Sequence, residues 1–156
     1  MHARIFQINT SRGGVPKRAV ATAEIDVEGI TIDKQRDRRH HGGPDRALAL
    51  FALETILELQ QEGHPIFPGS TGENITTVGI DQATLAPGVR LQLGDVVVVE
   101  VMSYCSPCKT IIDSFSGGDF NRISQKLHPG QSRVYVRVIQ TGDIRVGDGI
   151  RLIEHA

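Results

Sequence analysis

Two cysteines, Cys105 and Cys108, are the residues of this chain best suited to redox or metal chemistry. Ser106 can cap a helix and Pro107 suits the first helical position, so we expect a helix that places Cys108 in its first turn. The free N–H groups and the dipole at such a helix start favour a thiolate, and Lys109 adds a positive charge. This pattern predicts that Cys108 is a nucleophile or a metal ligand.

Cys105 leaves several interpretations open. Because it lies just before the expected helix, it could act as a resolving thiol for an oxidised Cys108. A structural disulfide would close a very small loop, which contributes only about 2 kcal/mol. The Cys-x-x-Cys spacing is also half of a zinc site, completed by His40 and His41, although neighbouring side chains in an extended segment point to opposite sides. Two small, buried and inert cysteines are the remaining alternative.

A basic segment over residues 36–46 is the second candidate. Arginine guanidinium groups bind phosphate oxygens in pairs, and glycines let the backbone approach a ligand closely. The segment therefore predicts a site for an anionic group, and the alternative is a solvated basic loop. The residues expected to bind are Arg36, Arg38, Arg39, His40, His41, Gly42, Gly43, Asp45 and Arg46.

A glycine-rich segment over residues 69–75 is the third candidate. Its N–H and hydroxyl groups can face an anion, and Gly72, Glu73 and Asn74 are the residues we expect at the ligand. A common surface turn is the alternative. Arg133 and Arg137 share one face of an expected strand, where one of them could reach a pocket but exposure is the usual outcome.

The elements that must position these residues are mostly strands. Alternating or β-branched stretches predict strands over 3–9, 18–30 with a bend at Gly29, 46–51, 96–101 and 133–140. Two similar turn–strand–turn segments occupy 87–95 and 141–148. Helices are expected over 54–61, with Leu53, Ile56, Leu57 and Gln60 on one face, and over 120–127. The fold class is therefore mostly β or α+β, a β-barrel with a few peripheral helices.

Length and composition limit the function classes. The 156 residues form one expected domain, residues 1–156, with 39% hydrophobic and 22% charged residues. A net charge of −1 argues against nucleic acid as a partner. No apolar stretch suggests a membrane span or a signal peptide, so we expect a cytoplasmic protein that does not bind membranes.

The order of five short motifs resembles the MOSC family, named for the C-terminal domain of molybdenum cofactor sulfurase, and in particular its small stand-alone bacterial members. Together they extend over about residues 5–152. The motifs are His40-His41-Gly42-Gly43-Pro44-Asp45-Arg46-Ala47, Gly72-Glu73-Asn74-Ile75, Leu93-Gly94-Asp95, Pro107-Cys108 and Val146-Gly147-Asp148.

The resemblance implies a MOSC-type β-barrel with a site around Cys108, where the family's cysteine carries sulfur or ligates the molybdenum of a pterin cofactor. The basic segment would then hold the cofactor phosphate. Better-known relatives reduce N-hydroxylated compounds with molybdenum and a separate electron donor. This chain is not expected to have a pyridoxal-phosphate site, because the desulfurase half of the sulfurases has no counterpart in it.

Three functions follow as hypotheses. The first is a molybdenum-dependent oxidoreductase that acts on a small N-hydroxylated or N-oxygenated substrate. It would receive electrons from a separate electron donor, with Cys108 as the metal ligand. The second is a sulfur carrier, in which a cysteine desulfurase supplies a persulfide to Cys108. The third is a dithiol or zinc module built on Cys105 and Cys108.

Overall fold

Strands make up most of the regular structure. The computed structural model describes residues 2–33 and 43–153. The strands are β1 (Arg4–Thr10), β2 (Arg18–Val20), β3 (Thr22–Asp26), β4 (Gly29–Ile30), β5 (Leu48–Ala52), β6 (Ile75–Val78), β7 (Arg90–Leu93), β8 (Val97–Tyr104), β9 (Val134–Gln140), β10 (Gly142–Arg145) and β11 (Ile150–Ile153). The helices are α2 (Leu53–Gln61) and the short 3-10 turns η1 (Pro44–Arg46), η2 (Gln82–Thr84), η3 (Lys109–Ser114), η4 (Ser116–Gly118) and η5 (Phe120–Ile123).

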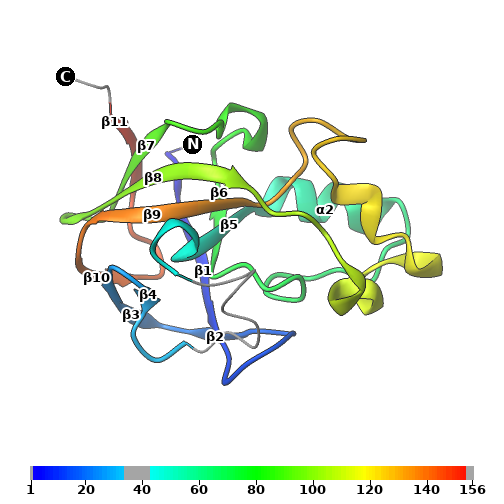
Figure 1. The fold of residues 1–156 in the computed structure, drawn as a ribbon, viewed down its shortest axis with the longest axis horizontal. Helices are drawn as coiled ribbons and strands as arrows, with labels where there is room; N and C mark the ends of the chain where they lie inside the picture. The colour runs from blue at the N-terminus through cyan, green and yellow to red at the C-terminus, as the bar shows by residue number, and fades with distance from the viewer. Residues whose placement is uncertain (1, 34–42, 154–156) are drawn as a thin grey trace.

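The strands form one large and one small sheet. The large sheet has the order β11-β7-β8-β9-β5-β6-β1-β2, in which only β5 and β6 pair in parallel, and the small sheet has the order β10-β3-β4. Figure 1 shows the small sheet beside the curled end of the large one. The expectation of a mostly β chain with a few helices is confirmed.

The expected barrel is not confirmed, because the large sheet stays open in the part of the chain that the structure describes. Its outer strands are β11 and β2. One isolated bridge, Arg4 with Gly149, and a hydrogen bond from Ile5 N to Asp148 O (2.8 Å) join β1 to the turn before β11. The chain leaves β2 after three residues, and β3 then pairs with β10 in the small sheet, so no continuous ladder closes the circle.

The concave side of the sheets encloses the larger apolar core, which we call the sheet core. Alternation along the strands builds it: Leu91 and Leu93 of β7 are fully buried, whereas Arg90 and Gln92 between them are half-buried. The core also contains Ile5, Ile8, Ile25, Leu48, Leu50, Ile75, Val97, Val99, Val101, Val134 and Val136.

A second apolar cluster, which we call the helix core, lies between α2 and the η3–η5 segment. Figure 1 shows this region at one end of the molecule, beside the ends of β5 and β8. The expected apolar face of α2 is wrong in part: Leu57 is 47% exposed, whereas Ile56 and Leu59 are fully buried. The helix core contains Phe51, Ile56, Leu59, Ile66, Ile111, Phe115 and Ile123.

The predicted helix start at Ser106 and Pro107 is also wrong. Cys108 is extended (φ −145°, ψ 176°) and precedes the 3-10 helix η3, with no side-chain cap. The N–H of Cys105 donates to Arg133 O (2.9 Å). The pairing of β8 with β9 therefore continues one residue beyond both strands, and the chain is still extended when it leaves β8. Cys108 therefore lacks the α-helical first turn that the sequence predicted.

The other expected elements occur with shifted ends. The strands β1, β8 and β9 match the predicted stretches, and the predicted second helix shortens to η5. No helix among residues 2–33 and 43–153 is long and apolar enough to cross a membrane.

Candidate functional site

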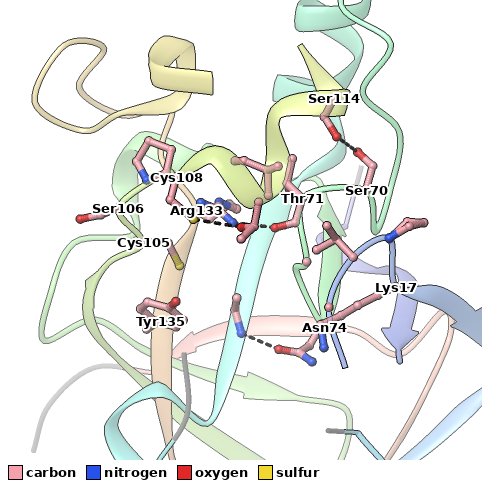
Figure 2. A pocket seen from close by; sticks show the side chains of 18 of the residues that line it. Lys17, Ser70, Thr71, Asn74, Cys105, Ser106, Cys108, Ser114, Arg133 and Tyr135 are labelled. Carbon is pink, nitrogen blue, oxygen red and sulfur yellow. Dashed lines mark hydrogen bonds between the residues drawn. The ribbon is translucent and has the colours of Figure 1, made fainter. Parts of the chain in front are cut away.

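A cavity of about 720 Å³ opens where the sheet ends meet the η3 segment. Its volume lies in the range of small-molecule and cofactor sites. Figure 2 shows Cys105 and Tyr135 on one side of it and Asn74 and Lys17 on the other. The lining residues are Gly14, Val15, Pro16, Lys17, Arg46, Ala49, Phe67, Ser70, Thr71, Gly72, Asn74, Tyr104, Cys105, Ser106, Pro107, Cys108, Thr110, Ile111, Asp113, Ser114, Arg133 and Tyr135.

The fold brings together part of the predicted site. Cys105, Cys108, Arg46, Gly72 and Asn74 all line this cavity, although they come from three separate segments. Three predicted residues do not line it: Gly43, Asp45 and Glu73. The predicted residues Arg36, Arg38, Arg39, His40, His41 and Gly42 lie outside the described residues.

Cys108 offers the more accessible thiol. Its side chain is half-buried, and its Sγ lies 2.9 Å from the hydroxyl oxygen of Thr110, with either atom able to donate. Lys109 is exposed next to it. A thiol that is half-open to a cavity and has a hydroxyl partner can bind a soft metal or accept a sulfur atom.

Cys105 lies in a different environment. It is 2% exposed and packs with Ala49 and Tyr135. Burial raises the pKa of its thiol to about 11, although Arg133, a hydrogen bond with Tyr135, and Arg46 act in the opposite direction. Burial likewise raises the pKa of the Tyr135 hydroxyl. Cys105 is therefore a protonated thiol at neutral pH.

Two arginines bring positive charge into the cavity. Arg133 is 7% exposed, and its Nη1 donates to Thr71 O (2.6 Å), whereas its Nε has no hydrogen-bond partner among the described residues. The guanidinium carbon of Arg46 lies 5.4 Å from the ring centre of Tyr135. Of the two outcomes left open for the strand arginines, Arg133 follows the less usual one: it lies just before β9, lines the cavity and binds the 69–72 loop at Thr71 instead of being exposed.

A buried ion pair lies on the side of the cavity that Lys17 and Asn74 line. The Nζ of Lys17 lies 2.7 Å and 2.9 Å from the two carboxylate oxygens of Asp33, and both side chains are at least nine-tenths buried. Asn74 donates from Nδ2 to Asp33 (2.9 Å) and accepts the N–H of Ala49 at Oδ1 (2.9 Å). Sequence patterns did not point to Lys17, because only the fold brings it to Asp33.

The loop of residues 69–72 forms one edge of the cavity. Gly69 has φ +88°, and a Cβ there would lie 2.5 Å from Lys17 O, so only glycine fits this close approach. The side chain of Glu73 lies under the loop and accepts hydrogen bonds from Gly69 N (2.9 Å), Thr71 Oγ1 (3.1 Å) and Thr76 Oγ1 (3.0 Å). Burial raises the pKa of the Glu73 carboxyl.

One side-chain contact joins this loop to the Cys108 segment. The hydroxyl of Ser114 donates to Ser70 Oγ (2.9 Å), and both residues are buried at the cavity. Among the described residues, no group of three or more His, Cys, Asp or Glu side chains could hold a metal ion. The predicted zinc site depends on His40 and His41, which are not described.

Three proteins of known sequence resemble this chain. YflK from Bacillus subtilis is 28% identical over 142 residues, which cover 90% of this chain and 63% of YflK. YiiM from Escherichia coli is 26% identical, with 86% of this chain and 63% of YiiM covered. A protein from Gibberella moniliformis named "Reductase" is 28% identical over 118 residues, which cover 73% of this chain and 21% of that protein. The chain thus spans just under two thirds of the length of YflK and YiiM.

Solved structures share the fold. YiiM from Geobacillus stearothermophilus matches with a TM-score of 0.74 at 23% identity, covering 97% of this chain and 75% of that one. The YUAD protein from Bacillus subtilis matches with a TM-score of 0.75 at 17% identity, covering 100% and 98%. At these identities the likeness concerns the fold.

The family model of the MOSC domain matches residues 37–151, which is well over half of the sequence. The matched range contains residues 37–46 of the basic segment, the 69–75 loop and both cysteines. This chain belongs to the MOSC domain family.

Proposed function

We propose that this protein binds a molybdenum-pterin cofactor in the cavity, with Cys108 as the metal ligand, and reduces small N-hydroxylated or related N-oxygenated compounds. The observation that carries this proposal is that a half-buried thiol and a buried, incompletely paired guanidinium line the same cavity. MOSC domains are associated with this cofactor, and a distant relative carries the name "Reductase".

The part of the cavity that Arg133 and Arg46 line suits the phosphate end of such a cofactor. Arg133 lines the cavity, and a phosphate oxygen there would accept a charge-assisted bond from its guanidinium, which has one hydrogen bond among the described residues. Arg46 would add a second guanidinium. We also propose that Gly72 and Asn74 contact the cofactor at the cavity. The basic segment would add further contacts, because Asp33, which precedes it in the sequence, binds the cavity residues Lys17 and Asn74.

The apolar lining residues and Cys108 suit the ring system and the metal of such a cofactor. Val15, Pro16, Phe67 and Ile111 give it apolar walls, on which a flat heterocycle can pack. A thiolate at Cys108 is a soft ligand of the kind that a molybdenum centre accepts. The hydroxyl of Thr110 would adjust the charge on that sulfur through the 2.9 Å contact.

The proposed reaction needs an electron donor. Reduction of an N–OH group breaks the N–O bond, takes up two electrons and two protons, and releases water and the N–H product. The bound cofactor would supply a centre that passes electrons to the substrate. A separate redox protein would then supply new electrons to the cofactor. In this arrangement the chain's own residues bind the cofactor, orient it and shield one side of it from water.

The activity test uses benzamidoxime as the substrate and reduced methyl viologen as the electron donor, with benzamidine measured by chromatography. Protein produced in a host that makes molybdenum pterin should form benzamidine, and Cys108→Ser should lower the rate by at least about 100-fold. Cys105→Ala serves as the matched thiol control and should retain most of the rate. Undiminished activity in Cys108→Ser would contradict the proposal.

A sulfur carrier is the second candidate, because the half-buried Cys108 can receive sulfur whereas Cys105 is enclosed. A persulfide on a cysteine desulfurase would transfer its outer sulfur to the Cys108 thiol, leaving the desulfurase cysteine as a thiol. Mass spectrometry after incubation with a desulfurase and free cysteine should then show one added sulfur on Cys108. Its absence in protein with a reactive Cys108 would contradict this function.

A further inference from the structure

We propose that Glu73 is a positioning residue that holds the 69–72 loop so that Thr71 fixes the guanidinium of Arg133 in the cavity. The sequence analysis placed Glu73 at the ligand, but its side chain is fully buried under the loop and does not line the cavity. This inference deepens the proposed function, because it explains how the proposed anion-binding arginine is held.

Three donors converge on the Glu73 carboxylate. One oxygen accepts the backbone N–H of Gly69 and the hydroxyl of Thr76, and the other accepts the hydroxyl of Thr71. These contacts hold the loop at both its start and its middle. No salt bridge to this buried carboxylate is seen among residues 2–33 and 43–153, and an unpaired charge is unfavourable in the interior, so its hydrogen bonds are what make this position tolerable.

The loop that Glu73 holds then contacts three walls of the cavity. Gly69 O accepts the backbone N–H of Lys17 (2.9 Å), and Ser70 Oγ accepts the hydroxyl of Ser114 (2.9 Å). Thr71 O accepts Nη1 of Arg133 (2.6 Å), as the dashed contact in Figure 2 shows. Among the described residues, Thr71 is the one hydrogen-bond partner of this guanidinium, so the direction of the arginine depends on where Thr71 lies.

Glutamine offers a conservative test of this role. Its carbonyl oxygen can accept from Gly69 and Thr76, and its amide can donate to the Thr71 hydroxyl, which can turn to accept. Leucine fills a similar volume and leaves all three donors without a partner. Glu73→Gln should therefore preserve the loop, whereas Glu73→Leu should release it.

The first measurement follows Arg133 directly and needs no ligand. In ¹⁵N-labelled protein, the side-chain N–H signal of Arg133 is assigned by its loss in Arg133→Lys. We expect a sharp, slowly exchanging signal in the wild type and in Glu73→Gln, and a broadened or fast-exchanging one in Glu73→Leu. Thr71→Val, which removes one of the three donors, keeps the test available if Glu73→Leu does not fold, and should show an intermediate change.

The second measurement separates positioning from general destabilisation. Binding of inorganic phosphate is measured by calorimetry for Glu73→Leu, Arg133→Gln and the double variant. We expect Glu73→Leu to weaken binding by about tenfold and to have little further effect when Arg133 is already changed. Asp81→Ala removes the cap that accepts Ala83 N (3.0 Å), and Asp81 does not line the cavity, so this variant controls for lost stability without lost binding.

Two results would overturn the inference: an Arg133 signal in folded Glu73→Leu identical to the wild type, or additive effects of Glu73→Leu and Arg133→Gln on phosphate binding. A wild type that binds no phosphate but shows the expected change of the Arg133 signal would instead contradict the proposed anion site and leave the positioning role supported.

Discussion

The sheet core and the helix core differ in how they hold their share of the cavity. The sheet core is continuous across both sheets, and backbone ladders join its strands. The helix core is a separate cluster of seven buried residues, and the η3–η5 segment on it consists of short 3-10 turns without a long hydrogen-bonded helix. The sheet side is therefore the more rigid of the two walls.

Each region contributes a different chemistry to the cavity. Three positively charged residues line it on the sheet side: Lys17 and Arg133 come directly before β2 and β9, and Arg46 ends η1 shortly before β5. The accessible thiol, Cys108, begins the segment that packs on the helix core. The proposed site thus combines anion-binding arginines on the more rigid sheet side with a thiol on the less rigid η3–η5 segment.

Few polar contacts join the η3–η5 segment to the rest of the molecule. Beyond the Ser114–Ser70 contact, the N–H of Ser116 donates to His64 Nδ1 (3.0 Å). Arg122 binds both carboxylate oxygens of Glu62 (2.7 and 2.8 Å). These contacts and the helix core set the position of Cys108, which makes the comparison testable by separate changes to each region.

Matched truncations in the two cores should have the largest and most different effects. Leu50→Ala in the sheet core should lower the free energy of unfolding by about 2–5 kcal/mol and reduce hydrogen-exchange protection throughout the chain. Phe115→Ala in the helix core removes a side chain that is also buried. It should reduce protection chiefly over residues 108–123, because this segment can open without the sheets. Equal loss of protection everywhere in Phe115→Ala would contradict the comparison.

Breaking the buried ion pair between Lys17 and Asp33 should have the next largest effect. Asp33→Asn leaves the ammonium of Lys17 buried without its carboxylate, and we expect a loss of about 3 kcal/mol in the free energy of unfolding. Chemical denaturation of Asp33→Asn, of Lys17→Met and of the double variant measures this loss. The double variant should recover part of the loss, and an additive result would show that the two side chains do not act as a pair.

Thiol alkylation tests whether the two cysteines differ as the cavity walls do. At pH 8, a pKa of about 11 leaves about one Cys105 thiol in a thousand ionised, and burial also blocks the reagent. Iodoacetamide should therefore label Cys108 first, with Cys105 labelled only after unfolding or at strongly alkaline pH. Peptide mapping by mass spectrometry checks this. Equal labelling, or ready formation of a Cys105–Cys108 disulfide in the folded protein, would favour the dithiol module.

The surface clamp between α2 and η5 should have the smallest effect. The hydrogen bond from Arg122 holds the pKa of the Glu62 carboxyl below its ordinary value. The stabilisation is therefore complete above the ordinary value and disappears as the pH falls through the lower, folded value. Because the carboxylate is 39% exposed, Glu62→Gln should cost less than about 1 kcal/mol at neutral pH and less still in high salt. Thermal unfolding against pH and salt measures it, and a pH-independent difference would contradict this assignment.

Local patterns predicted the parts of the fold that local forces determine. The β-branched run of β8, the alternation of β9 and the glycine after α2 correctly indicated two strands and a helix end. The start of η3 was missed because Cys105 continues the pairing with the neighbouring strand end, and this contact spans 28 residues of sequence. Tertiary pairing there outweighed the local preference for a capped helix.

The site was predicted only as far as its motifs extend. The motifs identified Cys108, Arg46 and Asn74, and the strand pattern allowed either Arg133 or Arg137 to reach a pocket without deciding between them, whereas nothing near Lys17 in the sequence marks it as a cavity residue. Lys17 and Arg133 are brought to the cavity by contacts with residues that are distant in the sequence, namely Asp33 and Thr71. Glu73 shows the converse case, in which a motif residue supports the cavity without lining it.

The most direct test of the central claim is the metal content of the purified protein. The chain and its Cys108→Ser and Cys105→Ala variants would be produced in a host that makes molybdenum pterin, and molybdenum and zinc would be quantified per chain. We predict close to one molybdenum per chain in the wild type and in Cys105→Ala, and loss of it in Cys108→Ser. Molybdenum that stays bound in Cys108→Ser, or zinc that is lost in both variants, would contradict the proposed role of Cys108.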